Sequence, residues 1–489
     1  MNFLKNHFFV IFLSAILIIS LAPLIAMIPL NNWDECVYAE YAKQMKINNN
    51  YLIYYWNGKE VFEKPPLYGI LLQIPFFLGI NEFTARIFSL IFGLGTIILV
   101  YFYSYNYLSK LVAVFSLLIF SQSLFFISSF IVINIDIIAS FFIFLGFYLF
   151  TSSIKHKKFR YFSFMAGLIF GLAILIRGLI VLIFLLAMVI STFLIFRSDK
   201  KSKYLKILIF ILMASLIITI PWHIYAIKKY GYEFIKVYFF DNIFFRSINS
   251  IFITRPIFYY FYILARDSFP WFLLIFYFIF YFISRISKVN FDTSITKINR
   301  ERIFIITFTL ISILLLTIAE TRMRIYVIMF YPFYAITLAI LFEIIYLKTK
   351  KAFFLLIFLF FLTFVKFLIP NYHFTYANNN GEFIKMENIL LKLKYTEIEE
   401  IEYLVSPRWR KFASYKNIIP AQLFYGDKPC LIFYSGKKFN IYYDTDSFKR
   451  RIFRGVKSLF LMSKEDYYLI KDLPVEIIEN NSYYILFEN

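Results

Sequence analysis

The chain has 489 residues and a formal net charge of +21, with 61% hydrophobic, 22% aromatic and 17% charged residues. Its mean hydropathy is +0.70. A soluble globular domain is roughly half apolar and about a quarter charged, so this composition excludes an ordinary soluble enzyme and indicates a polytopic membrane protein.

The positive charge is spread over short stretches between apolar runs. This pattern argues against nucleic-acid binding, because such proteins concentrate their basic residues in one folded domain. Basic loops mark the cytoplasmic side of a membrane protein. With a cytoplasmic N-terminus, the four main basic clusters fall on that side: 155–158 with Arg160, 197–206, 285–302 and 348–351.

A membrane span needs about 20 mostly apolar residues. The first candidate, residues 8–30, is too long for a cleaved signal and lacks a small-residue cleavage motif after it. Residues 31–81 then form a long polar and aromatic loop, which we place on the outer side. The further predicted spans are 83–104, 111–131, 133–151, 161–176, 179–196, 204–224, 257–284, 303–319, 325–347 and 352–369. We therefore predict a mainly α, polytopic helical bundle of about 11 to 13 spans.

The character of the chain changes after Pro370. Residues 1–370 are the predicted transmembrane domain, and residues 371–489 are a predicted small α/β domain on the outer side. Its short β-type runs are 429–434 and 482–487, and its helix-like runs are 381–394 and 464–471.

Acids and a lysine gather in the first outer loop. Asp34 stands just after the first span, and Glu63-Lys64 stand before Pro65-Pro66, which are predicted to stop a helix and hold an extended stretch. Residues 38–45 have helical periodicity and predict a juxtamembrane helix. We favour a functional role for Asp34 and for Glu63-Lys64.

Other loop acids have a simpler interpretation. For Glu35, Glu40 and Glu60 we favour charges that pair with one another in a solvated loop.

Asp136 lies in an apolar run near the outer end of a span, and an acid there is a functional-site hypothesis by default. A helix cap or an interhelical polar contact is its open alternative. Arg177-Gly178 marks the next outer turn, where an interfacial snorkelling arginine is the alternative.

Basic residues in the later outer loops oppose the orientation rule and need an explanation. Arg246, Arg255 and Arg324 would suit a lipid phosphate, because arginine gives bidentate hydrogen bonds to phosphate oxygens. Binding of bulk anionic lipid is the open alternative for any one of them. Asp241 and Tyr326 belong to the same outer regions.

Cys36 and Cys430 are the only cysteines, so we predict neither a disulfide framework nor a cysteine-based metal site. The histidines are scattered without metal-ligand spacing. We predict that no cofactor is required, with a divalent metal near Glu63 as the alternative.

The chain resembles the C-type membrane glycosyltransferases that use polyprenyl-phosphate sugars, and within them the lipid A aminoarabinose transferases and protein O-mannosyltransferases. The resemblance extends over roughly residues 10–345. Its most specific parts are Trp33-Asp34-Glu35 and Glu63-Lys64-Pro65-Pro66-Leu67. The other matching parts are Tyr38-Ala39-Glu40, Asp136, Arg177-Gly178, Asp241-Asn242 with Arg246, Phe269-Pro270-Trp271 and Arg324-Ile325-Tyr326.

The resemblance implies roles by position. It implies that Asp34, Glu63 and Asp136 are catalytic acids, and that Lys64, Arg246 and Tyr326 bind the donor phosphate. The further candidates for substrate binding are Glu35, Arg177, Asp241, Arg255 and Arg324. Relatives often carry a lysine where this chain has Arg177, and a histidine near Asn242. The second difference disfavours a metal site at that position.

The implied function is transfer of a sugar from an undecaprenyl-phosphate-type donor to an acceptor on the outer face of the membrane, most simply lipid A. Protein hydroxyls and a surface polysaccharide are alternative acceptors. A glycan polymerase and, in another functional class, a lipid-linked-sugar flippase are the competing interpretations. The implied location is the bacterial inner membrane, with several spans, an active site facing the periplasm and membrane lipids as neighbours.

Overall fold

The computed structural model describes residues 2–196, 201–250, 254–286, 300–348, 358–359, 361–363, 380–413, 423–454 and 457–489. The predicted span 352–369 lies almost entirely outside these residues. The chain divides into two compact units. We call them the helical unit (1–25, 86–235 and 243–375) and the sheet unit (26–85, 236–242 and 376–489).

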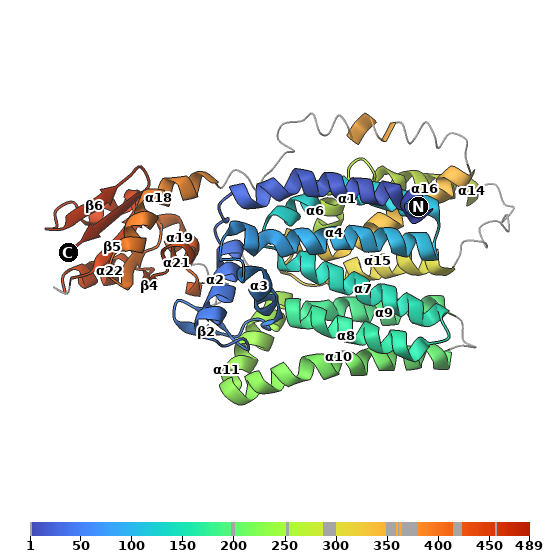
Figure 1. Cartoon of the computed structure of the whole chain (residues 1–489), viewed down its shortest axis with the longest axis horizontal. Helices are drawn as coiled ribbons and strands as arrows, with labels where there is room; N and C mark the ends of the chain where they lie inside the picture. The colour runs from blue at the N-terminus through green and yellow to red at the C-terminus, as the bar shows by residue number, and fades with distance from the viewer. Residues whose placement is uncertain are drawn as a thin grey trace. The chain divides into compact units, whose positions relative to one another are not determined.

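Long apolar helices build the helical unit, as the sequence predicts (Figure 1). They begin with α1 (Asn2–Met27), α4 (Glu82–Tyr107), α5 (Lys110–Ser121), α6 (Leu124–Ser128), η1 (Ser129–Ile131), α7 (Ile135–Lys155), α8 (Phe159–Arg177), η2 (Leu179–Val181) and α9 (Leu182–Ile195). They continue with α10 (Lys201–Tyr230), α11 (Tyr232–Phe234), η4 (Ile235–Phe245), α12 (Arg246–Ile248), α13 (Tyr259–Asp267), α14 (Leu273–Ile286), α15 (Arg300–Thr317), η6 (Arg324–Phe330) and α16 (Tyr331–Lys348).

Six helices of the described residues are long and apolar enough to cross a membrane, and a seventh span results if the bent pair α5 and α6–η1 counts as one. Helices α9 and η2 together are apolar but shorter. The predicted hairpin at 161–196 is present: α8 ends at Arg177, and the chain turns at Gly178, which has a φ of 85°. A positive φ carries no steric penalty for glycine.

Helix α8 lies between α7 and α10 (Figure 1). Gly167 and Gly171 stand one turn apart on α8 and allow this close approach. A Cβ atom at Gly167 would lie 2.3 Å from the carbonyl oxygen of Ile211, and one at Gly171 would lie 3.0 Å from that of Ser215. Small residues at this spacing let helix backbones meet in a membrane, where van der Waals packing drives association.

The predicted first outer loop, residues 31–81, belongs to the sheet unit. Helix α2 (Asp34–Ile47) contains the predicted juxtamembrane helix and ends just before Asn48. Strands β1 (Tyr54–Trp56) and β2 (Lys59–Val61) form a hairpin around Asn57-Gly58. Both turn residues have positive φ, 51° and 78°, as a two-residue hairpin turn of this type requires.

The two prolines have a different effect from the predicted one. Instead of holding an extended stretch, Pro66 has helical backbone angles and caps the N-terminus of α3 (Leu67–Phe76). A proline is compatible with the start of a helix, because the missing N–H would have no partner there. Glu63 and Lys64 therefore stand just before a helix.

A five-stranded sheet with the order β4-β3-β5-β7-β6 forms the core of the C-terminal part, as the predicted α/β character requires. Its strands are β3 (Glu400–Leu404), β4 (Lys438–Tyr442), β5 (Leu459–Ser463), β6 (Glu476–Asn480) and β7 (Tyr484–Glu488). Strands β4, β3 and β5 run parallel, whereas β7 is antiparallel to β5 and β6. Its helices are α18 (Asn380–Tyr395), α19 (Pro407–Ala413), α21 (Cys430–Ser435), α22 (Thr445–Ile452) and η9 (Lys464–Leu469).

The predicted β-run 429–434 is wrong: this segment is helix α21. Pro429 provides its N-cap, and Gly436 follows with a left-handed φ of 72°. A proline at the start and a glycine just past the end favour a helix, and here they outweigh the β propensity of the residues between.

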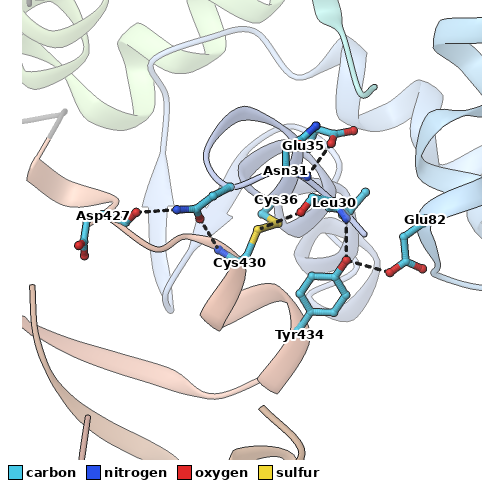
Figure 2. The surroundings of a disulfide bond; sticks show 9 residues. Leu30, Asn31, Glu35, Cys36, Glu82, Asp427, Cys430 and Tyr434 are labelled. Atoms are coloured by element: carbon cyan, nitrogen blue, oxygen red, sulfur yellow. Dashed lines mark hydrogen bonds between the residues drawn. A yellow bond between two sulfur atoms is a disulfide. The ribbon is translucent and has the colours of Figure 1, made fainter. Parts of the chain in front are cut away.

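The two cysteines, from which no disulfide framework is predicted, form a single disulfide. Cys36 on α2 and Cys430 on α21 are joined by a disulfide across a sequence separation of 394 residues (Figure 2). Asn32 reinforces the link, because its Nδ2 donates to the carbonyl oxygen of Asp427 at 2.7 Å. The Tyr434 hydroxyl accepts from the backbone N–H of Leu30 and donates to the carboxylate of Glu82 (Figure 2). The start of α2 is thus fixed to the C-terminal part of the chain.

Candidate functional site

The first group of candidate residues surrounds the N-terminus of α2 in the sheet unit. Asp34 is the first residue of this helix and is exposed, whereas Glu35 is buried and accepts a hydrogen bond from the backbone N–H of Asn31 at 2.6 Å. Carboxylates are stabilised at a helix N-terminus by the helix dipole. Glu35 is thus buried against the backbone instead of lying in a solvated loop, whereas Asp34 is exposed.

The backbone at Trp33, directly before Asp34, has a φ of 81°. This conformation is costly for a bulky residue and needs support from its surroundings. The support comes from aromatic packing, with ring centroids 5.3 Å from Trp409 and 6.0 Å from Tyr425. The C-terminal part of the chain therefore helps to set the direction in which α2 begins.

Lys64 is partly buried and contacts α2. Its Nζ donates to the hydroxyl of Tyr38 and lies 4.8 Å from the centroid of that ring. The Tyr38 ring in turn packs edge-on against Tyr68, at 5.1 Å. This ammonium group is thus held in place by aromatic side chains.

Glu63 faces two buried tyrosines. The hydroxyls of Tyr41 and Tyr425 are hydrogen-bonded to each other. Burial raises the pKa of both phenols well above the ordinary value, and the nearby negative charge of Glu63 raises each pKa further. Both phenols are therefore neutral hydrogen-bonding groups beside this carboxylate at any physiological pH. Sequence reasoning missed both tyrosines, since Tyr425 is some 360 residues away from Glu63 in a chain rich in tyrosine.

The second group of candidate residues lies in the helical unit. Asp136 is fully buried at the N-terminus of α7, and Nε of Arg177 at the end of α8 donates to its Oδ1 at 2.5 Å. The Arg177 guanidinium also lies over the ring of Tyr326, 5.3 Å from its centroid. Asp136, Arg177 and Tyr326, which are predicted from separate parts of the sequence, therefore lie in contact through Arg177. The interhelical polar contact, the open alternative for Asp136, is present, and Asn134 provides the helix cap instead.

Asp267 is a buried acid that the sequence analysis did not include among its site residues. Its Oδ1 accepts from Nη2 of Arg324 at 3.0 Å and its Oδ2 accepts from the hydroxyl of Tyr331 at 3.0 Å. Arg266 approaches the same carboxylate at 3.3 Å, and the Arg324 guanidinium stacks on Phe125 at 3.8 Å. The only signal in the sequence was an Arg-Asp pair just before Phe269-Pro270-Trp271, which is easily taken for a surface ion pair.

The remaining arginines lie where two loops of the helical unit meet. Nη1 of Arg255 donates to the carbonyl oxygen of Arg322, and Nη1 of Arg322 donates back to the carbonyl oxygen of Arg255 at 2.7 Å. The carbonyl oxygen of Arg246 accepts from the backbone N–H of Thr321 at 3.1 Å. These contacts fix the backbone that bears Arg246.

Asp241 belongs to η4 and is partly exposed, in the sheet unit. Among the residues that the structure describes, no group of three or more His, Cys, Asp and Glu side chains is arranged to hold a metal ion. The candidate residues thus lie in both units, with Asp34, Glu63 and Lys64 in the sheet unit and Asp136, Arg177 and Tyr326 in the helical unit.

The dolichyl-phosphate-mannose-protein mannosyltransferase family matches residues 63–225 of this chain. Two uncharacterized proteins of Aquifex aeolicus are similar in sequence. One is 26% identical over 309 residues, which are 63% of this chain and 58% of that protein. The other is 30% identical over 205 residues, which are 40% of this chain and 44% of that protein. The match therefore spans less than two thirds of either relative.

The fold is similar to solved structures over nearly the whole chain. ArnT from Cupriavidus metallidurans, bound to undecaprenyl phosphate, superposes with a TM-score of 0.75 at 14% identity, covering 99% of this chain and 98% of that one. The oligosaccharyltransferase AglB from Archaeoglobus fulgidus, in complex with an inhibitory peptide and a dolichol-phosphate, superposes with a TM-score of 0.53 at 13% identity, covering 95% of this chain and 70% of that one.

Proposed function

Because this chain has the fold of the C-type membrane glycosyltransferases, as its sequence predicts, we propose that it transfers a sugar from a polyprenyl-phosphate donor to an acceptor on the outer face of the membrane. The observation that carries the proposal is the likeness of fold to ArnT along 99% of the chain. The ligands named in the two solved structures, undecaprenyl phosphate and dolichol-phosphate, favour a lipid phosphate as the leaving group here too.

The proposed reaction is a direct displacement. The acceptor hydroxyl loses its proton to a carboxylate, its oxygen bonds to the anomeric carbon, and the bond from that carbon to the phosphate oxygen breaks. Asp34 is our assignment for the base, since it is the exposed acid at the start of α2. Glu63 and Asp136 are the alternatives that variants separate.

The departing lipid phosphate gains negative charge, and cations placed beforehand would stabilise it. Lys64 suits this role because its ammonium group is held in place by Tyr38. We assign Arg246 and Tyr326 to the same phosphate. Arg177, Arg255 and Arg324 would have supporting roles, since each already binds a carboxylate or a carbonyl oxygen. Glu35 and Asp241 are the remaining candidates for contact with substrate.

The Cys36–Cys430 disulfide supports an outward-facing active site. Disulfides form and persist in oxidising compartments such as the periplasm and the cell exterior. This one joins α2, which bears Asp34, to the C-terminal part of the chain. It therefore favours a location of both segments on the outer side of a bacterial inner membrane.

We propose lipid A as the acceptor, because the sequence resembles the lipid A aminoarabinose transferases. Protein hydroxyls are the second candidate, favoured by the match of residues 63–225 to a family of protein mannosyltransferases. Mass spectrometry of lipid A from cells with and without this chain separates the two. An added sugar that depends on the chain supports lipid A, and identical spectra direct the search to glycoproteins.

The catalytic assignment is tested with the variants Asp34→Asn, Glu63→Gln and Lys64→Ala in detergent, using a radiolabelled polyprenyl-phosphate sugar. Loss of a catalytic acid or of a phosphate-binding cation typically costs about 10²-fold or more in rate. Glu60→Gln is the matched control, since Glu60 is an exposed acid on β2, three residues before Glu63. Normal turnover in all three folded variants would refute the assignment. We expect no cofactor, so chelation with EDTA should leave the rate unchanged.

A further inference from the structure

The sheet unit contains a pocket with a volume of about 620 Å³ that none of the residues discussed as catalytic lines. Its lining comes from the hairpin turn Asn57-Gly58-Lys59, from strand β4 with Tyr443, from Glu400 and from Leu423-Phe424. Ligand pockets typically measure about 300–1,000 Å³. The size therefore suits a ligand of one to a few sugar rings.

The hairpin side of the pocket is fixed against the edge strand of the sheet. Nδ2 of Asn57 donates to the carbonyl oxygen of Phe439 at 2.6 Å, and the N–H of Phe439 donates to Oδ1 of Asn57 at 2.8 Å. Gly58 packs so closely that a Cβ atom there would lie 3.2 Å from Cε of Lys438. The pocket is therefore preformed and needs no loop closure to exist.

The polar lining favours an anion. Lys59 from the turn and Lys438 from β4 are both exposed, and neither has an ion-pair partner among the described residues. Among the described residues, Glu400 is the only acid that lines the pocket. Two lysines against one carboxylate leave a net positive charge, and hydrogen bonds from ammonium groups to an anion are stronger than neutral ones.

The remaining lining favours a sugar. Phe424, Tyr442 and Tyr443 are partly exposed and offer aromatic surface for the C–H face of a sugar ring. The amide Nδ2 of Asn440 donates to the carboxylates of Glu400 at 3.5 Å and Glu402 at 3.4 Å. The carboxylate oxygens of Glu400 can in addition accept hydrogen bonds from sugar hydroxyl groups. A few polar groups on an otherwise aromatic surface are the usual means of orienting a bound ligand.

The pocket adjoins the aromatic cluster around Glu63 within the same unit. Asn57 follows Trp56, and Phe424 precedes Tyr425, while the rings of Trp56 and Tyr425 lie 5.3 Å apart. We propose that the pocket binds an anionic saccharide, a sugar carrying phosphate or carboxylate, as the part of the acceptor that is not itself glycosylated. This inference rests on the proposed function and assigns a recognition site for its acceptor.

Titration calorimetry of the full-length protein in detergent tests the proposal without any turnover. The probes are a glucosamine disaccharide bearing phosphates, the same disaccharide without phosphate, and a disaccharide of uronic acid. We expect saturable binding of at least one anionic probe and binding at least about tenfold weaker of the neutral one. Comparison of the phosphate and carboxylate probes identifies the anion. Equal binding of the neutral probe, or no binding of any probe, overturns the proposal.

The double variant Lys59→Gln/Lys438→Gln should bind the preferred anionic probe at least about tenfold more weakly. Lys471→Gln, at an exposed lysine of the same unit that does not line the pocket, should bind like the unchanged protein. In the transfer assay the double variant should raise KM for the acceptor and leave KM for the donor unchanged. Unaltered binding in a folded double variant refutes the pocket, whereas the transfer reaction itself is judged only by the variants at Asp34, Glu63 and Lys64.

Discussion

Breaking the Asp136–Arg177 pair should destabilise the helical unit more than removing both charges. Asp136 is fully buried, only 12% of the Arg177 side chain is exposed, and their atoms lie 2.5 Å apart. Arg177→Met would leave a carboxylate in an apolar surrounding without this partner. Loss of one partner from a buried pair costs about 3–5 kcal/mol, whereas replacing both by neutral groups is often close to neutral.

A double-mutant cycle tests this expectation. It compares the free energies of unfolding of Arg177→Met, Asp136→Asn and the double variant, measured by SDS titration or by heating in detergent. We expect the single Arg177→Met to lose about 3–5 kcal/mol and the double variant to regain most of it. Arg266→Met is the control, because its side chain is 37% exposed. A double variant no more stable than Arg177→Met would refute the reasoning, since it would show that the buried charge carries no penalty.

Three further changes test other contacts. Cys430→Ser should lower the free energy of unfolding by about 2–4 kcal/mol and make the melting temperature insensitive to a reductant that lowers it in the unchanged protein. Asn57→Ala should cost about 2 kcal/mol, because it removes two hydrogen bonds to the edge of β4, and hydrogen exchange at the Phe439 amide should accelerate. Asp267→Asn should weaken the positioning of Arg324 and lower the transfer rate, and an unchanged rate would make Asp267 purely structural.

Much of the helical architecture follows from the sequence because its cause is local. Apolar runs of span length gave the positions of the long helices, and the periodicity of residues 38–45 gave α2. Segment 429–434 failed because its residues favour strands while its flanking Pro429 and Gly436 favour a helix. Asn57-Gly58 did carry a strong hairpin signal, which the sequence analysis did not use.

The candidate site is only partly readable from sequence, because contacts between distant segments leave no local signal. Asp34, Glu63 and Lys64 stand out as charges in an apolar chain. Nothing near Tyr425 indicates that it faces Glu63, and two cysteines 394 residues apart give no indication that they pair. Such partners are set by the tertiary fold, which a single sequence does not display.

The disulfide also gives the chain a closed covalent topology. Residues 36–430 form a ring that contains most of the helices of the helical unit. A single proteolytic cut within this ring leaves one covalently joined molecule until a reductant is added, so cleavage products would separate only on a reducing gel. The ring can close only after Cys430 has been synthesised. The segment bearing Asp34 therefore reaches this attachment only after a further 394 residues have been made.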